Sequence, residues 1–128
     1  TVNNFKISMK NTTATTLVGG TNNTTGYTVV YSGPITFGSI GWKVINLSTP
    51  FIRTAGQNLQ LKIERLDNIA NSRLVFDAAM GNNTSSTATS SRRYNGTASV
   101  TTSTSLTATF FRPAIQFIRP FPVDFSFV

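Results

Sequence analysis

The chain contains no cysteine and no histidine among its 128 residues. Without these two residue types it cannot build a Cys/His zinc site, a Ser-His-Asp triad, a thiol nucleophile or a disulfide. Acidic residues are also scarce, because Asp and Glu together number only four. We therefore expect a protein that is not an enzyme, with no catalytic residue and no cofactor.

Long apolar runs are absent as well, since no window approaches the ~18 consecutive apolar residues of a membrane-spanning helix. Hydrophobic residues still make up 39% of the chain, and they include ten Phe and one Trp, whereas charged residues make up 12%. This composition excludes a disordered polyelectrolyte and is sufficient for one hydrophobic core. We expect no insertion into a membrane.

Negative charge is in deficit, because 11 Lys and Arg residues leave a formal net charge of +7. An excess of this size is typical of proteins that bind nucleic acid or an anionic surface. Here, however, the basic residues are spread singly along the chain, and only Arg92 and Arg93 are adjacent. The distribution predicts scattered solvated cations and no nucleic-acid partner.

What the sequence does contain is alternation at period two, as in Phe5, Ile7 and Met9, which predicts half-buried β-strands. Aromatic and β-branched runs at 27–31 and 42–47 predict two more strands, with Trp42 in the core. Glycine and proline punctuate the chain, and no apolar stripe has helical spacing. Further alternating segments are 59–63, 74–76, 106–110 and 115–117. The pattern predicts an all-β fold, an antiparallel β-sandwich of jelly-roll type with about 8–9 strands and no substantial helix.

The domain organisation follows from two shifts in composition. Residues 82–105 are so rich in Ser, Thr and Asn that we expect long loops or edge strands there, within one sandwich domain at 1–119. Prolines interrupt the end of the chain, and we expect 120–128 to be an extended tail or edge strand, a linker or an inter-subunit strand. In this tail Val123, Phe125 and Phe127 alternate with polar residues. It either folds back as a last edge strand or pairs with a neighbouring module or an identical subunit.

Few residues qualify for a chemical site. Glu64 and Asp67 are the only two acids close in sequence, and a glycosidase needs two carboxylates across one cleft. We expect salt links from them instead. Glu64, Asp67 and Asn68 could supply oxygen ligands to a calcium ion, but two carboxylates are few for such a site, and no metal site is predicted.

Surface aromatics are the candidates for ligand binding, because their rings stack on sugars. Tyr94 lies beside Arg92 and Arg93 in the polar region, and Tyr27 begins an apolar run. These residues define a possible glycan site with Tyr94, Tyr27 and the two arginines as its members. Trp42 and Tyr31 could also stack on a sugar, although packing in the core is the expected role of Trp42.

Short motifs spread over about nine-tenths of the chain resemble a β-sandwich module of large secreted cell-surface proteins of the Bacteroidota. The pieces that carry the resemblance are Phe5 to Thr12, Val30 to Gly33, Gly41 to Leu47, Thr49 to Phe51, Gly56 to Leu59 and Arg112 to Phe117. The resemblance implies a fold-specifying role for these residues and no catalytic ones. It also implies that the chain is a module of an adhesin-like protein that is exported through the type IX secretion route.

Composition, pattern and resemblance together predict a non-enzymatic structural or adhesive module of a bacterial cell surface or an extracellular filament. Its expected partners are neighbouring modules or identical subunits. The alternatives are a carbohydrate-binding module that uses surface aromatics, with glycans as partners, and a viral coat or fibre subunit, since jelly rolls also build capsids.

Overall fold

The computed structural model describes residues 1–15, 17, 25–39, 41–65, 78–80, 92–93, 107–108, 111–113 and 115–118. Within them the chain is all-β and contains no helix. No helix in this part is long and apolar enough to cross a membrane. The strands of the described residues are β1 (Val2–Thr12), β2 (Thr28–Ile35), β3 (Asn58–Arg65), β4 (Ala78–Met80), β5 (Arg92–Arg93), β6 (Thr107–Ala108) and β7 (Phe111–Pro113).

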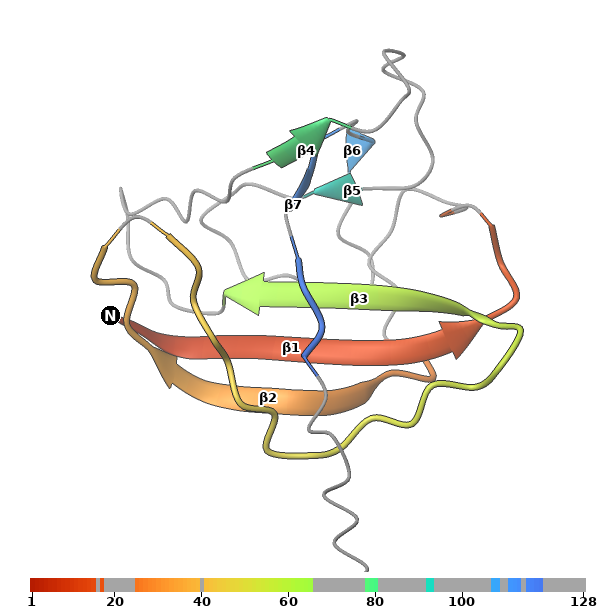
Figure 1. Ribbon diagram of the computed structural model, residues 1–128, viewed down its shortest axis with the longest axis horizontal. Helices are drawn as coiled ribbons and strands as arrows, with labels where there is room; N and C mark the ends of the chain where they lie inside the picture. Colours follow the sequence, from red (N-terminus) through yellow and green to blue (C-terminus); the bar gives the residue numbers. More distant parts are fainter. Residues whose placement is uncertain are drawn as a thin grey trace, which may run out of the picture.

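The three long strands form one antiparallel sheet in the order β2-β1-β3, with β1 in the middle (Figure 1). Two short antiparallel pairs, β4 with β7 and β5 with β6, complete the described strands. The all-β, antiparallel part of the prediction is thus confirmed. The alternation predicted at Phe5, at 27–31 and at 59–63 corresponds to β1, β2 and β3.

The sheet has one apolar and one polar face, as period-two alternation requires. Phe5, Ile7 and Met9 of β1 point to the apolar face, where Ile63 and Leu61 of β3 lie directly opposite Ile7 and Met9. Phe5 packs edge-on against the rings of Tyr31 and Phe37, with centroids 6.3 and 5.9 Å apart. The buried core consists of Val2, Phe5, Ile7, Met9, Val30 and Ile35.

Two bulges in the β1–β2 ladder adjust which side chains reach the core. The register passes from Val2↔Ile35 to Phe5↔Gly33, which leaves one extra residue in β1 and lets both Val2 and Phe5 point inward. It then passes from Ile7↔Tyr31 to Ser8↔Val29, so that Val30 has no partner in the ladder. Val30 is fully buried.

Two predicted strands are wrong. Segment 42–47 contains no strand, and neither does 115–118, where Ile115, Phe117 and Ile118 are exposed. Alternation creates an apolar face but no hydrogen-bonding partner, and a segment without a ladder is not a strand. Segment 74–76 lies outside the described residues, as do the tail at 120–128 and most of 82–105.

Candidate functional site

The connection between β2 and β3, residues 36–57, is the most prominent exposed feature of the described chain, and we call it the 36–57 loop. In Figure 1 it leaves β2, runs back along that strand and then enters β3. The backbone N–H groups of Ser48 and Thr49 both donate to the carbonyl of Val30, over 2.9 and 3.3 Å. The Ser48 hydroxyl donates to the same oxygen over 3.2 Å. The bulge at Val30 therefore provides the point at which the loop docks on β2.

A second anchor joins the loop to β1. The Asn11 side-chain amide donates to the Ile52 carbonyl over 2.9 Å and accepts from the Thr54 N–H over 3.1 Å. Just beyond, Gln57 N–H donates to the Thr54 carbonyl, which closes a turn with Gly56 at φ +75°. Asn11 therefore fixes the backbone of the loop near its end, at Ile52 and at Thr54.

The apolar residues of the loop are divided between core and solvent. Ile45 and Phe51 pack against the core cluster. Trp42, Val44 and Ile52, by contrast, are 72%, 66% and 85% exposed. The prediction that Trp42 fills the core is therefore wrong. Ile45 and Phe51 are the loop residues that pack there instead. A backbone fixed at Val30 and Asn11 thus presents a tryptophan ring to solvent.

A hollow of about 280 Å³ lies between the end of β2 and the loop. It is lined by Tyr31, Pro34, Ile35 and Thr36 on the β2 side and by Lys43, Val44, Ile45 and Asn46 on the loop side. Pro34 explains why the loop does not add to β2 as a further strand here. It has no N–H to donate, and its carbonyl accepts from the Tyr31 hydroxyl over 2.6 Å. Pro34 therefore offers a neighbouring strand no donor and only a carbonyl that is already bonded. A depression with mixed polar and apolar lining remains at this edge.

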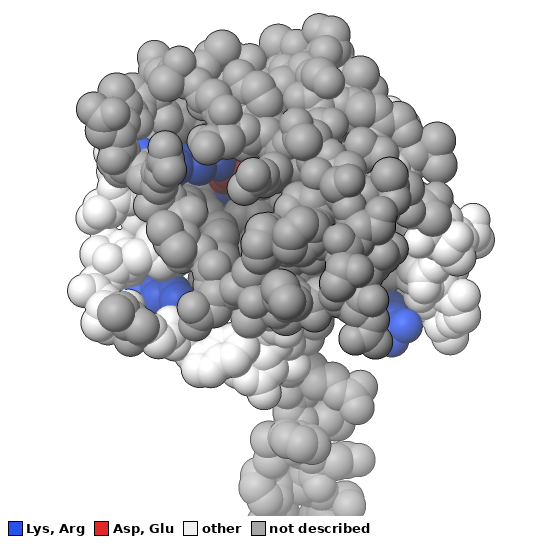
Figure 2. All heavy atoms as spheres, turned by 90° about the horizontal axis from the view of Figure 1, so that it is seen from above, with Lys and Arg blue, Asp and Glu red and all other residues white. Residues whose placement is uncertain are grey.

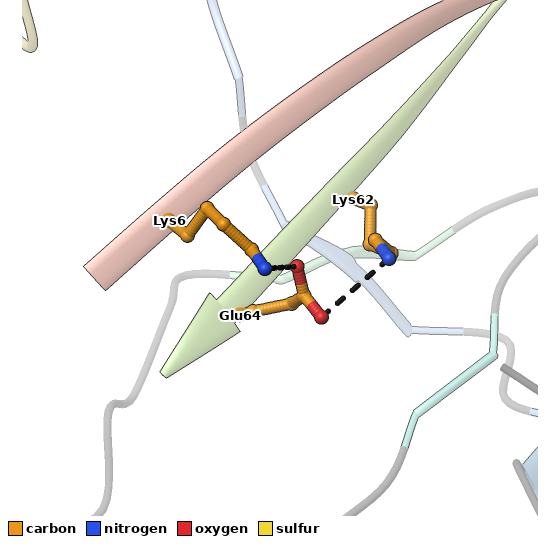
Figure 3. Close-up of polar contacts among 3 residues, drawn as sticks. All are labelled: Lys6, Lys62 and Glu64. Atoms are coloured by element: carbon orange, nitrogen blue, oxygen red, sulfur yellow. Dashed lines mark ion pairs between the residues drawn. The ribbon is translucent and has the colours of Figure 1, made fainter. Parts of the chain in front are cut away.

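The polar face of the sheet carries a separate charged cluster (Figure 3). Lys6 of β1 lies opposite Glu64 of β3, and its Nζ is 3.0 Å from Glu64 Oε2. Lys62, two residues before Glu64 on the same face of β3, brings its Nζ to 3.5 Å from Glu64 Oε1. Ser8, which lies opposite Lys62 on β1, is only 2% exposed. These partly buried contacts make Glu64 an ion-pair partner of two lysines, which is the salt-link role predicted for it.

Tyr27, just before β2, lies among the same charges. The Nζ atoms of Lys10 and Lys62 are 4.9 and 5.0 Å from the centroid of its ring. Burial, and to a lesser degree the negative charge of Glu64, raise the pKa of the Tyr27 hydroxyl. With two ammonium groups against its ring, Tyr27 contributes to the charged cluster and does not offer a free stacking surface.

The other predicted site residues are not brought together with Tyr27 by any described contact. Arg92 and Arg93 form β5, opposite Ala108 and Thr107 of β6. Tyr94, Asp67, Asn68, Val123, Phe125 and Phe127 lie outside the described residues. Within the described part no three acidic residues come together as metal ligands. On the face drawn in Figure 2, the visible Lys and Arg atoms lie in a few separate places.

Sequence reasoning missed the hollow and the exposure of Trp42. The signal was present in Gly41 and Pro34, which disfavour a regular strand pair, but the aromatic run outweighed it. Searches among protein-family models, curated proteins and solved structures find no match to this chain. Function must therefore be argued from the geometry of its own residues.

Proposed function

We propose that the chain is a non-enzymatic structural or adhesive module that makes contacts through the 36–57 loop. The observation that carries this proposal is the combination of firm anchoring and exposed apolar side chains in one loop. Trp42 and Ile52 are largely exposed, while hydrogen bonds to Val30 and Asn11 fix the backbone around them. Exposed apolar groups on a fixed backbone bind a partner at low entropic cost.

The proposal includes the finer architecture, a β-sandwich of jelly-roll type with about 8–9 strands. Its support is the three-stranded antiparallel sheet with one buried apolar face, together with two further strand pairs. It also includes a place at a bacterial cell surface or in an extracellular filament, with neighbouring modules or identical subunits as partners. The support for this part is the resemblance of the sequence motifs.

Light scattering of the purified chain over a range of concentrations tests the structural version of the proposal. We expect a mass above the 13.9 kDa of one chain that rises with concentration. Ile52→Ser removes the most exposed apolar side chain of the loop and should shift this association to higher concentration. Val29→Ser is the matched control, because Val29 is an exposed valine of β2 outside the loop.

A mass of one chain at every concentration would contradict self-assembly and leave adhesion to other molecules as the remaining version. Equal association of both variants and the native chain would show that the loop is not the contact.

A further inference from the structure

We propose that the hollow beside Trp42 binds an acidic saccharide, a chain of pyranose units that bear carboxylates. This inference rests on the proposed function, because it names the class of molecule to which the adhesive module binds. The site consists of the hollow's eight lining residues and the adjoining Trp42, and we call it the Trp42 site.

The lining has the mixed chemistry that a sugar requires. A pyranose presents C–H groups on its faces and hydroxyls at its rim, so its site needs apolar surface and polar partners together. Val44 provides exposed apolar surface next to the buried Ile35, and Asn46 provides an amide. The hydroxyls of Tyr31 and Thr36 are bonded to Pro34 and Thr1, but their oxygens can still accept a further hydrogen bond. The hollow is shallow and open to solvent, and its volume of about 280 Å³ suits partial enclosure of one sugar unit of a longer chain.

Trp42 extends this site along the loop. It directly precedes the four loop residues that line the hollow, and its side chain is 72% exposed. An exposed indole loses hydration favourably when a sugar ring stacks on it. A saccharide of several units can therefore place one ring in the hollow and the next over Trp42.

The positive charge of the site favours an acidic ligand. Lys43 lines the hollow, is exposed, and makes no ion pair or hydrogen bond with any residue that the structure describes. The single acid among the described residues, Glu64, is occupied by Lys6 and Lys62 on the polar face. A ligand carboxylate would thus meet one unpaired ammonium group and no described negative charge, in a chain with a net charge of +7.

The walls of the site are held before any ligand arrives. The Tyr31 hydroxyl is bonded to the Pro34 carbonyl, Ile45 packs against the core, and Ser48 is bonded to Val30. Because these contacts fix both sides of the hollow, little ordering is required on binding.

The test uses the intact chain, in which Trp42 is the only tryptophan and its fluorescence reports on this site alone. We would titrate the protein with a hexamer of galacturonate and, separately, with a neutral glucose hexamer. The expected result is a saturable change in emission and weaker quenching by acrylamide with the acidic hexamer, at an affinity at least tenfold higher than for the neutral one. Raising the salt concentration should reduce that preference.

Calorimetry of variants locates the site, because its signal does not require a tryptophan. Trp42→Ala should abolish measurable binding, and Lys43→Gln should weaken the acidic hexamer about tenfold while leaving the neutral one unchanged. Val29→Ser is the control, an exposed valine of β2 that lines neither the hollow nor the loop, and should bind as the native chain does. All three side chains are exposed, so each variant is expected to fold, as circular dichroism would verify.

Several results would overturn the inference. These are no saturable response, equal response to the neutral hexamer, binding that survives both Trp42→Ala and Lys43→Gln, or equally tight binding of a polyglutamate peptide. Equally tight binding of polyglutamate would show that the site binds polyanions in general and does not recognise a sugar. Self-association that Ile52→Ser weakens, without saccharide binding, would refute this inference but not the proposed function. A monomer that binds neither hexamer would refute this inference and the self-assembly version of the proposed function.

Discussion

The backbone N–H of Ser48 donates to the carbonyl of Val30 over 2.9 Å, at the one position where the β1–β2 register skips a residue of β2. The bulge performs two tasks at once. It turns the Val30 side chain into the core, and it leaves the Val30 carbonyl free for the loop, since that oxygen is not required by β1. Core packing and loop position are therefore coupled through one residue.

Replacing Val30 by Ala should lower the free energy of unfolding by about 2 kcal/mol, because two methyl groups leave a fully buried site. Val29→Ala is the matched control, since Val29 is 45% exposed and its truncation should cost less than about 0.5 kcal/mol. Urea unfolding of both variants measures the difference. Equal losses would mean that Val30 is not a core residue.

Asn11→Ala should release the end of the 36–57 loop, because it removes the bonds to Ile52 and Thr54 together. The expected loss of stability is about 1–2 kcal/mol, and acrylamide should quench the fluorescence of Trp42 more strongly. Asn58→Ala is the control, since it removes a bond to the Ala14 carbonyl, outside the loop. If both variants changed Trp42 quenching equally, the anchoring role of Asn11 would be refuted.

Tyr27 should make the chain less stable in alkaline solution. Burial and the Glu64 charge raise its pKa, so the folded state holds the phenolic proton more tightly than the unfolded state does. This contribution is fully present below about pH 10, the ordinary pKa of tyrosine, and is lost as pH rises through the folded-state pKa. Between these two values the native chain should lose more stability than Tyr27→Phe, as urea unfolding at increasing pH would show.

Glu64→Gln tests the electrostatic part of the same effect. Removing the negative charge should lower the pKa of Tyr27, measured by the ultraviolet absorbance of tyrosinate, but only partly, because burial is the larger cause. Tyr31→Phe in both backgrounds removes the signal of the other described tyrosine. A pKa of Tyr27 that does not change would contradict a Coulombic contribution from Glu64.

The sequence predicted the strands of the central sheet, though not their order, because the two faces of a strand are encoded locally. Phe5, Ile7 and Met9 alternate with Lys6, Ser8 and Lys10, and Leu59 to Ile63 do the same, so period two is evident in each strand. The pairing of Lys6 with Glu64 depends on register, which the pattern restricts but does not define. Ion pairing of Glu64 with Lys62, two residues away on the same strand, was predictable, whereas its pairing with Lys6 was not.

Trp42 could be identified from the sequence as a residue able to stack on a sugar, but the hollow and the exposure of the ring could not, because they result from a strand pair that fails to form. An aromatic and β-branched run indicates a strand only if a ladder partner exists. Pro34 and the Val30 bulge prevent β2 from being that partner for residues 43–46, and this depends on contacts between residues distant in sequence. Burial of Ile45 with exposure of Trp42 follows from the same geometry.

Gly56→Ala should destabilise the chain through backbone strain alone. Gly56 has φ +75°, a conformation that L-residues rarely adopt, while a Cβ there would meet no atom within 4 Å. The expected cost is about 1 kcal/mol, relative to Gly38→Ala, where the space is equally open but φ is not positive. Because Gly38→Ala only restricts the unfolded chain, it should be neutral or stabilising by a few tenths of a kcal/mol, up to about 1 kcal/mol.

The strain at Gly56 should also perturb the turn from Thr54 to Gln57. The stability losses of Asn11→Ala and Gly56→Ala should therefore be less than additive, since both substitutions act on the same end of the loop. Full additivity would show that the turn and the Asn11 anchor hold the loop independently.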